Sequence, residues 1–302
     1  MRIDGLRQIA ARFDGMLIDQ FGVIHDGQQL YPGTLRILSE LQAMDIPAAV
    51  MTNSGKRAAA NRERLVRMGV PRGLFVDAVS SGEVAYRALA HFDPEPDHRS
   101  ARRHPGEGRG PALDRGKLDA SLRWHDGDDP VKAREASGIR KAFLIGKDGE
   151  DYGFDGIDFV ADPAQAEIML ILGSNAPRTS LDDYRRLFTG ITLPALCCNP
   201  DRLMLTPNGL VPAPGAIAAL YEEMGGKVTW IGKPYPDIYR EAARLIGNPP
   251  RILCIGDSPE HDVAGGRNAG FSTLLVLQGV SAGRDVADLS PQPDFVMDSF
   301  VW

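Results

Sequence analysis

Short apolar segments of the chain repeatedly end in a polar or charged residue and are then followed by a stretch with helical spacing. Clear cases are residues 15–20, 46–54, 251–258 and 272–278, and similar segments recur between residues 141 and 198. Apolar strands that alternate with amphipathic helices predict a parallel sheet covered by helices on both faces. We therefore expect an α/β protein whose functional groups gather at the carboxyl ends of its strands.

Composition argues against several classes of protein. The 302 residues carry a formal net charge of −6, whereas nucleic-acid-binding surfaces are usually basic. The N-terminal stretch lacks the apolar centre of a signal peptide, and no apolar run reaches the length of a membrane span. Three cysteines, at positions 197, 198 and 254, lie in apolar surroundings. They indicate buried thiols and a reducing cytoplasm rather than a disulfide framework.

The middle of the chain has a different composition. Residues 94–131 are rich in Pro, Gly and charged residues and contain few large apolar ones. Such a segment buries too little apolar surface to offset its ordering entropy, so we interpret it as a disordered insertion. Strand-like and helix-like segments resume after it. We expect a smaller α/β domain at 81–201 inserted between the two halves, 1–80 and 202–302, of the first domain.

Four expected strand ends carry residues capable of chemistry. These are Asp19, the run Thr52-Asn53-Ser54, Lys233, and Asp257 with Asp262 five residues later. Each taken alone is also ordinary turn or helix-capping chemistry. Because the carboxyl ends of parallel strands share one edge of a sheet, the four together predict a single site.

Phosphoryl transfer requires the functions that these residue types supply. Asp19 can attack phosphorus, and Asp19 and Asp257 can hold Mg²⁺, which prefers carboxylates, waters and phosphate. Asp262 can hold a metal-bound water. Lys233 can neutralise charge on the nucleophile and the phosphoryl group. The Thr52 hydroxyl and the polar groups of the two residues after it can bind the remaining oxygens.

The combination resembles the haloacid dehalogenase (HAD) superfamily. The stretches "TNSGK", "GKPYPDIY" and "NPDRLMLTPNGLVPAPGAIAA" are similar to its subfamily IIA, the nitrophenyl-phosphatase and sugar-phosphatase group. The resemblance implies a Rossmann-like core, an inserted C2-type cap, and a Mg²⁺-dependent hydrolase that forms an aspartyl-phosphate. It implies Asp19 as nucleophile, Thr52 as phosphate binder, Lys233 as the cation and Asp257 and Asp262 as the acids of the fourth motif. It is compatible with a homodimer formed through the cap.

The first motif departs from the usual family pattern D-x-D-G, because it reads Asp19-Gln20-Phe21-Gly22. The second Asp of that pattern protonates the leaving oxygen, which Phe21 is unable to do. The backbone carbonyl of Phe21 can still bind the metal. The general acid–base catalysis that the second Asp would supply is typically worth roughly 10²–10⁴-fold in rate. His25 and Asp26 on the same loop are candidates for a replacement, and a good leaving group would lessen the need for one.

Three functions remain open at this point. The first is a phosphatase acting on a small phosphorylated metabolite in the cytoplasm. The second is an enzymatically weak or inactive HAD-fold protein that binds a phosphorylated ligand. The third is another HAD reaction, such as phosphonate or haloacid cleavage, for which the available cap lysines are Lys141 and Lys147.

Several residues are expected near the domain junction or in the cap. The candidate hinges are Ser80–Gly82 and Asn199–Asp201, both rich in turn residues. Asn199 and Asp201 either face the cleft or form a turn. Asn175 and Arg178 either approach the substrate or belong to a surface loop before a helix that Ser180 would cap.

Overall fold

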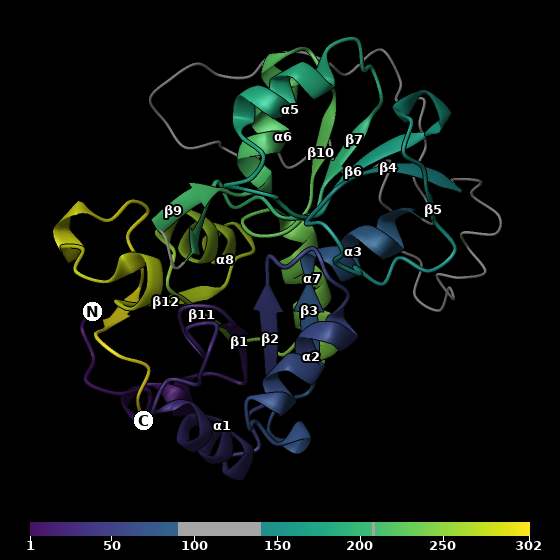
Figure 1. Cartoon of the computed structure of the whole chain (residues 1–302). Coiled ribbons are helices and arrows are strands. Elements are labelled where there is room, and N and C mark those ends of the chain that lie inside the picture. The colour runs from purple at the N-terminus through teal and green to yellow at the C-terminus, as the bar shows by residue number, and fades with distance from the viewer. Residues whose placement is uncertain (90–139, 207–208) are drawn as a thin grey trace.

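The computed structural model describes residues 1–89, 140–206 and 209–302. Two sheets lie one above the other, and the N- and C-terminal ends of the chain lie near each other on the lower half (Figure 1). The expected insertion at 94–131 falls outside the described residues.

The lower half is built on a six-stranded parallel sheet in the order β13-β12-β11-β1-β2-β3. Its strands are β1 Gly15–Asp19, β2 Ala48–Thr52, β3 Ala78–Ser80, β11 Ile252–Gly256, β12 Ser272–Val276 and β13 Phe295–Met297. Every residue of the central strand β1 is buried. Both faces of the sheet are therefore covered, as near-continuous apolar strands require.

Helices cover the two faces of this sheet. On one face, Met16 and Ile18 pack with apolar residues of α1 and α2. On the other face, Leu17 packs with residues of α3 and α7. The helices of this half are α1 Thr34–Ala43, α2 Ala58–Arg67, α3 Ser81–Ala88, α7 Pro236–Leu245 and α8 Ala264–Asn268. The alternation of β1 side chains between the two faces follows from the two-residue period of a strand.

The upper half contains a five-stranded parallel sheet in the order β10-β7-β6-β4-β5. Its strands are β4 Lys141–Ile145, β5 Asp158–Phe159, β6 Ile168–Ile171, β7 Ala195–Cys197 and β10 Val228–Trp230. Helices α5 Leu181–Phe188 and α6 Pro214–Glu223 pack on one face. The other face shares one apolar core with the lower half. An antiparallel hairpin, β8 Leu203–Thr206 with β9 Gly209–Pro212, projects beside it (Figure 1).

The two halves meet along a seam that the carboxyl ends of both sheets approach. Gly55, in the loop after β2, has no room for a side chain because a Cβ there would lie 2.2 Å from the carbonyl oxygen of Leu172, just after β6. The backbone N–H of Arg57 donates to the carbonyl of Tyr152 at 3.3 Å. An ion pair joins Lys56 to Glu150. The loops after β2, β4 and β6 therefore pack against one another, and we call this boundary the seam.

The sequence predicted the α/β class, the parallel core and the inserted α/β cap, and the structure confirms them. The position of β10 differs from the expected domain limits. Residues 202–302 were assigned to the first domain, yet Val228–Trp230 pairs with β7 at the edge of the second sheet. A three-residue strand is too short to show which sheet it joins, because its pattern is compatible with either.

Several smaller predictions are also confirmed. Ser180 caps α5, and its side chain and that of Asp183 form a reciprocal capping box. All three cysteines are free and buried. The stretch with helical spacing that follows residues 251–258 forms a π-helical turn, Pro259–Val263, and then the short α8. No helix in the described ranges combines the length and apolar character needed to cross a membrane.

Candidate active site

Asp19 lies at the carboxyl end of β1, the central strand of the lower sheet. Strands β2 and β11 flank β1 in parallel register, so the residues that follow them emerge beside Asp19. Asp19 is 6% exposed. A charged group is rarely buried to this degree unless it is paired, so its partners define the site.

Lys233 is the direct partner of Asp19. Its Nζ lies 2.6 Å from Asp19 Oδ1 and 2.7 Å from Asp262 Oδ1, and all three side chains are buried. Lys233 follows β10, so the cation comes from the upper sheet and the nucleophile candidate from the lower one. The two carboxylates raise the pKa of the Lys233 ammonium against the opposing effect of its burial. Lys233 is therefore charged throughout the physiological range.

Asp257 and Asp262 complete the cluster. Asp257 follows β11, and its Oδ2 accepts a hydrogen bond of 2.8 Å from the backbone N–H of Val280. Two glycines with positive φ, Gly22 and Gly279, press against this carboxylate, since a Cβ on either would lie about 2 Å from its Oδ2. Asp262 lies on the turn after β11, and its Oδ2 accepts from the backbone N–H of Ser258 at 3.1 Å. The carboxylates of Asp257 and Asp262 are thus fixed by backbone contacts, and that of Asp19 is held by Lys233.

The cluster has the composition of a cation site. One carboxylate oxygen from each of Asp19, Asp257 and Asp262 lies within 4.8 Å of the others. Burial raises the pKa of Asp19 well above its usual value and that of Asp257 to about 7, and the neighbouring carboxylates contribute to both shifts. A single ammonium faces three acids, so a divalent cation would stabilise their ionised forms. Three oxygen ligands fit a hard cation such as Mg²⁺.

The loop after β2 supplies polar groups beside this cluster. The hydroxyl of Thr52 accepts a 3.3 Å hydrogen bond from the backbone N–H of Ser54. The side-chain amide of Asn53 is fully engaged in hydrogen bonds, so binding of phosphate by this residue remains a prediction for its backbone N–H. Its Oδ1 accepts from Lys233 N–H at 2.7 Å and from Ser81 Oγ at 3.2 Å. Its Nδ2 donates to Asp201 Oδ1 at 2.8 Å and to the Lys233 carbonyl at 3.1 Å. Asn53 therefore holds three chain segments together at the seam.

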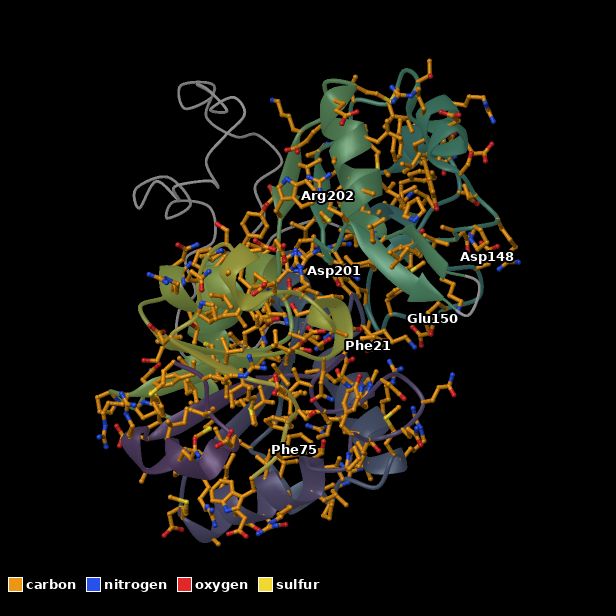
Figure 2. The ribbon with its side chains drawn as sticks, turned by 90° about the vertical axis from the view of Figure 1, so that its left-hand side faces the viewer. Phe21, Phe75, Asp148, Glu150, Asp201 and Arg202 are labelled. Carbon is orange, nitrogen blue, oxygen red and sulfur yellow. The ribbon has the colours of Figure 1, made fainter. Side chains whose placement is uncertain are left out.

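Phe21 faces the seam from the core side. Figure 2 shows it where the two halves meet, near the cap loop that carries Glu150. Its side chain is 42% exposed although it belongs to the loop directly after Asp19. The ring packs edge-to-face on His25, with 5.6 Å between centroids. An apolar ring thus lies at the mouth of an otherwise acidic site.

His25 is poorly suited to replace the missing acid. It is 1% exposed, and its Nδ1 accepts a 2.9 Å hydrogen bond from Gly27 N–H, which places the proton of a neutral ring on Nε2. Burial, together with Arg64, lowers the pKa of His25 to about 4. Asp26 is committed to its own turn, since Oδ1 accepts from the N–H groups of Gln28 and Gln29 at 2.8 and 2.9 Å. The Asp26 carboxylate is therefore engaged within the loop, whereas Nε2 of His25 is buried without a hydrogen-bond partner.

The structure also shows where Asp201, Asn175 and Arg178 lie, for which the sequence left two interpretations open. Asp201 lies at the seam, where it binds Asn53 and lies 3.3 Å from Nδ1 of His261. Asn175 and Arg178 contact Asp148 within the cap, which favours the surface-loop reading. Three contributors were missed by sequence reasoning: the N–H of Val280, the hydroxyl of Ser81 and the His261 ring. The backbone N–H of Val280 has no side-chain signature in the sequence. His261, in contrast, lies inside the "GDSPEHD" stretch, so its proximity to Asp257 in the sequence was a usable signal.

Comparison with known proteins agrees with this geometry. A sequence profile described as haloacid dehalogenase-like hydrolase matches residues 16–100, and a HAD-hydrolase-like profile matches residues 230–302. Dihydroxyacetone phosphatase of Corynebacterium glutamicum (strain R) is 30% identical over 165 residues, 52% of this chain and 58% of that protein. The match thus spans little more than half of that relative. Human chronophin is 26% identical over 288 residues, 93% of this chain and 86% of chronophin.

A solved structure shares the fold over the whole chain. It is a haloacid dehalogenase-like family hydrolase from Brucella suis 1330, with a TM-score of 0.75 and 23% identity over 99% of this chain and 100% of that one. The two profiles cover the segments that carry Asp19 and Thr52 on one side and Lys233, Asp257 and Asp262 on the other. The chain belongs to the haloacid dehalogenase-like hydrolases.

Proposed function

We propose that the protein is a Mg²⁺-dependent phosphohydrolase that acts on a small phosphorylated metabolite through an aspartyl-phosphate on Asp19. The observation that carries the proposal is the contact of Lys233 with both Asp19 and Asp262 inside a buried cluster of three carboxylates. A structural ion pair would not require three acids around one base. The relatives named as phosphatases support the same class of reaction.

The arrangement suits nucleophilic displacement at phosphorus. The Asp19 carboxylate is the attacking group, and the Lys233 ammonium holds it in place and attracts the phosphoryl oxygens. The Thr52 hydroxyl and N–H groups of the following loop offer further donors. A Mg²⁺ ion held by Asp19, Asp257, Asp262 and the Phe21 carbonyl would neutralise phosphoryl charge. In the second half-reaction water displaces Asp19 as a carboxylate, which Lys233 stabilises.

Phosphate release with Mg²⁺ tests the proposal over a panel that includes dihydroxyacetone phosphate and nitrophenyl phosphate. Asp19→Asn should reduce release to background, because an amide is a poor nucleophile. Asp14→Asn is the matched control, since Asp14 lies five residues earlier and pairs with Arg251 outside the site. Mass spectrometry of acid-quenched protein should find phosphate on the peptide that carries Asp19. Equal release by wild type and Asp19→Asn would contradict the proposal.

A second function is favoured by one observation, the apolar Phe21 next to the site. A protein that binds a phosphorylated ligand without turnover would tolerate this residue. Calorimetry with the same panel would then show Mg²⁺-dependent binding without phosphate release. Phosphonate cleavage through a cap lysine would have to use Lys147, in the loop after β4, because Lys141 begins β4 at the end remote from the seam.

A further inference from the structure

We propose that the substrate is a phosphate whose leaving oxygen is weakly basic, as in an aryl, enol or acyl phosphate, so that it departs as an anion without receiving a proton from the protein. This inference rests on the proposed phosphohydrolase function and narrows its substrate class. We call the buried, charged floor formed by Asp19, Lys233 and Asp262 the base of the site, and we call the exposed side formed by Phe21 and Val280 its mouth. The inference follows from the contrast between these two parts.

The direction of attack places the leaving group on the mouth side. A group displaced in line lies opposite the attacking Asp19 oxygen, so it points away from β1 and toward the cap. Phe21 and Val280 are next to this part of the site in the chain, since each adjoins a glycine, Gly22 or Gly279, that packs on Asp257. The two side chains are 42% and 64% exposed, and neither carries a proton that it could donate. The leaving group therefore meets an apolar rim.

Acidic side chains across the seam are engaged in other contacts. Glu150 pairs with Lys56, and Asp148 bonds with Asn175 and Arg178. Asp201 accepts from Asn53 and faces His261. The carboxylates of these three residues are therefore held by partners other than a leaving oxygen.

Both half-reactions balance without a proton from the protein. In the first, the Asp19 Oδ–P bond forms and the P–O bond to the leaving group breaks, with the electron pair remaining on the departing oxygen. In the second, water attacks phosphorus, the Asp19–P bond breaks, and dihydrogen phosphate carries away both protons of the water. Aspartate is itself a weakly basic leaving group, and Lys233 Nζ lies 2.6 Å from its oxygen. The second step therefore needs less acid help than release of an alkoxide.

The consequence is a strong dependence of rate on the leaving group. Missing acid catalysis is worth roughly 10²–10⁴-fold, and it is felt most where the leaving oxygen is strongly basic. We expect kcat/KM to fall steeply along a series of substituted phenyl phosphates, from nitrophenyl to phenyl to methoxyphenyl, and alkyl phosphates to be poorest. The series keeps size and shape nearly constant, so the slope reports charge on the leaving oxygen. kcat/KM is the right quantity because it covers the steps up to P–O cleavage.

Variants at Phe21 give the decisive comparison. Phe21→Asp supplies a carboxyl group at the mouth and should flatten the slope, raising kcat/KM for phenyl phosphate relative to nitrophenyl phosphate by about tenfold or more. The side chain introduced by Phe21→Asn has nearly the same shape as the one introduced by Phe21→Asp, but it has no acidic proton. The slope of Phe21→Asn should therefore stay as steep as that of the wild type. Circular dichroism melts check that both variants fold. If neither variant folds, the slope of the wild type alone tests the proposed substrate class.

The outcomes separate the two proposals. A wild-type kcat/KM that varies by less than about twofold along the series would overturn the substrate class while leaving Asp19-dependent phosphate release intact. A flat wild-type slope that becomes steep in His261→Gln would identify His261 as a proton donor and would likewise overturn it. An equally steep slope in Phe21→Asp would overturn the assignment to Phe21. No release from any substrate would remove both proposals together.

Discussion

The base and the mouth of the site differ in both burial and polarity. At the base, Asp19, Lys233 and Asp262 are almost entirely buried, and the Lys233 ammonium contacts both carboxylates at distances shorter than 3 Å. At the mouth, Phe21 and Val280 are exposed and apolar. The base fixes a nucleophile and its counter-charge with no freedom to rearrange, as electrostatic preorganisation requires. The side chains of Phe21 and Val280 offer no proton, so we expect specificity for the leaving group to arise there.

The largest expected effect comes from removing the charge at the base. Lys233→Met leaves the Asp19 and Asp262 carboxylates buried without their partner, and breaking a buried pair in this way costs about 3–5 kcal/mol. Turnover should fall to background as well, because the attacking carboxylate loses its counter-charge. Urea unfolding and phosphate release measure the two effects. Lys227→Met, at an exposed lysine just before β10, is the matched control and should change neither by much. Similar unfolding midpoints for Lys233→Met and wild type would show that the buried ion pairs of Lys233 do not stabilise the fold.

The pH dependence of stability tests the same cluster through Asp257. Its pKa is about 7 in the folded protein against 3.8 in an exposed aspartate. Between these values the folded state binds more protons than the unfolded state, so stability falls as pH rises. In a chelator, the free energy of unfolding should drop by up to about 4 kcal/mol from pH 4 to pH 8 through this group.

Mg²⁺ and a single variant separate this effect from other titrations. Saturating Mg²⁺ should make the profile flatter, because a bound cation stabilises the ionised carboxylates. Asp257→Asn should flatten it without the cation. A metal-free protein more stable at pH 8 than at pH 5.5 would show that the cluster does not titrate in the expected direction.

The clamp at Asn53 connects the base to the cap and should give the next largest effect. Asn53→Ala removes the partners of Lys233 N–H and Asp201, which leaves buried polar groups unsatisfied at about 2–3 kcal/mol. Mg²⁺ affinity and turnover should also fall, since Lys233 loses its backbone support. Ser180→Ala removes the cap of α5 at about 1 kcal/mol and lies away from the seam, so it should leave Mg²⁺ affinity unchanged. Equal loss of Mg²⁺ affinity in both variants would reduce Asn53 to an ordinary structural residue.

The base was more predictable from the sequence than the contacts that hold it. Asp19, Thr52 and Asp257 lie at the ends of apolar strands of one parallel sheet, which brings them to one edge, whereas Lys233 reaches them from the other sheet. The Asn53 clamp depends on a side chain 148 residues away, at Asp201, and no local pattern encodes such a contact. The strand before Lys233 joins the upper sheet because of pairing partners that its three residues do not reveal.

The smallest predicted effect concerns a backbone group at the mouth. Val280 donates its N–H to Asp257 Oδ2 at 2.8 Å while its side chain lies 64% exposed. Val280→Pro removes the donor, and a lost hydrogen bond to a charged group is worth about 1.5–3 kcal/mol. Val280→Ala retains the N–H and should stay within about 0.5 kcal/mol of wild type. Thermal unfolding and Mg²⁺ titration of the two variants measure the difference. If Val280→Ala lost as much as Val280→Pro, the exposed side chain and not the backbone would support Asp257, and the division between a fixed base and a permissive mouth would fail.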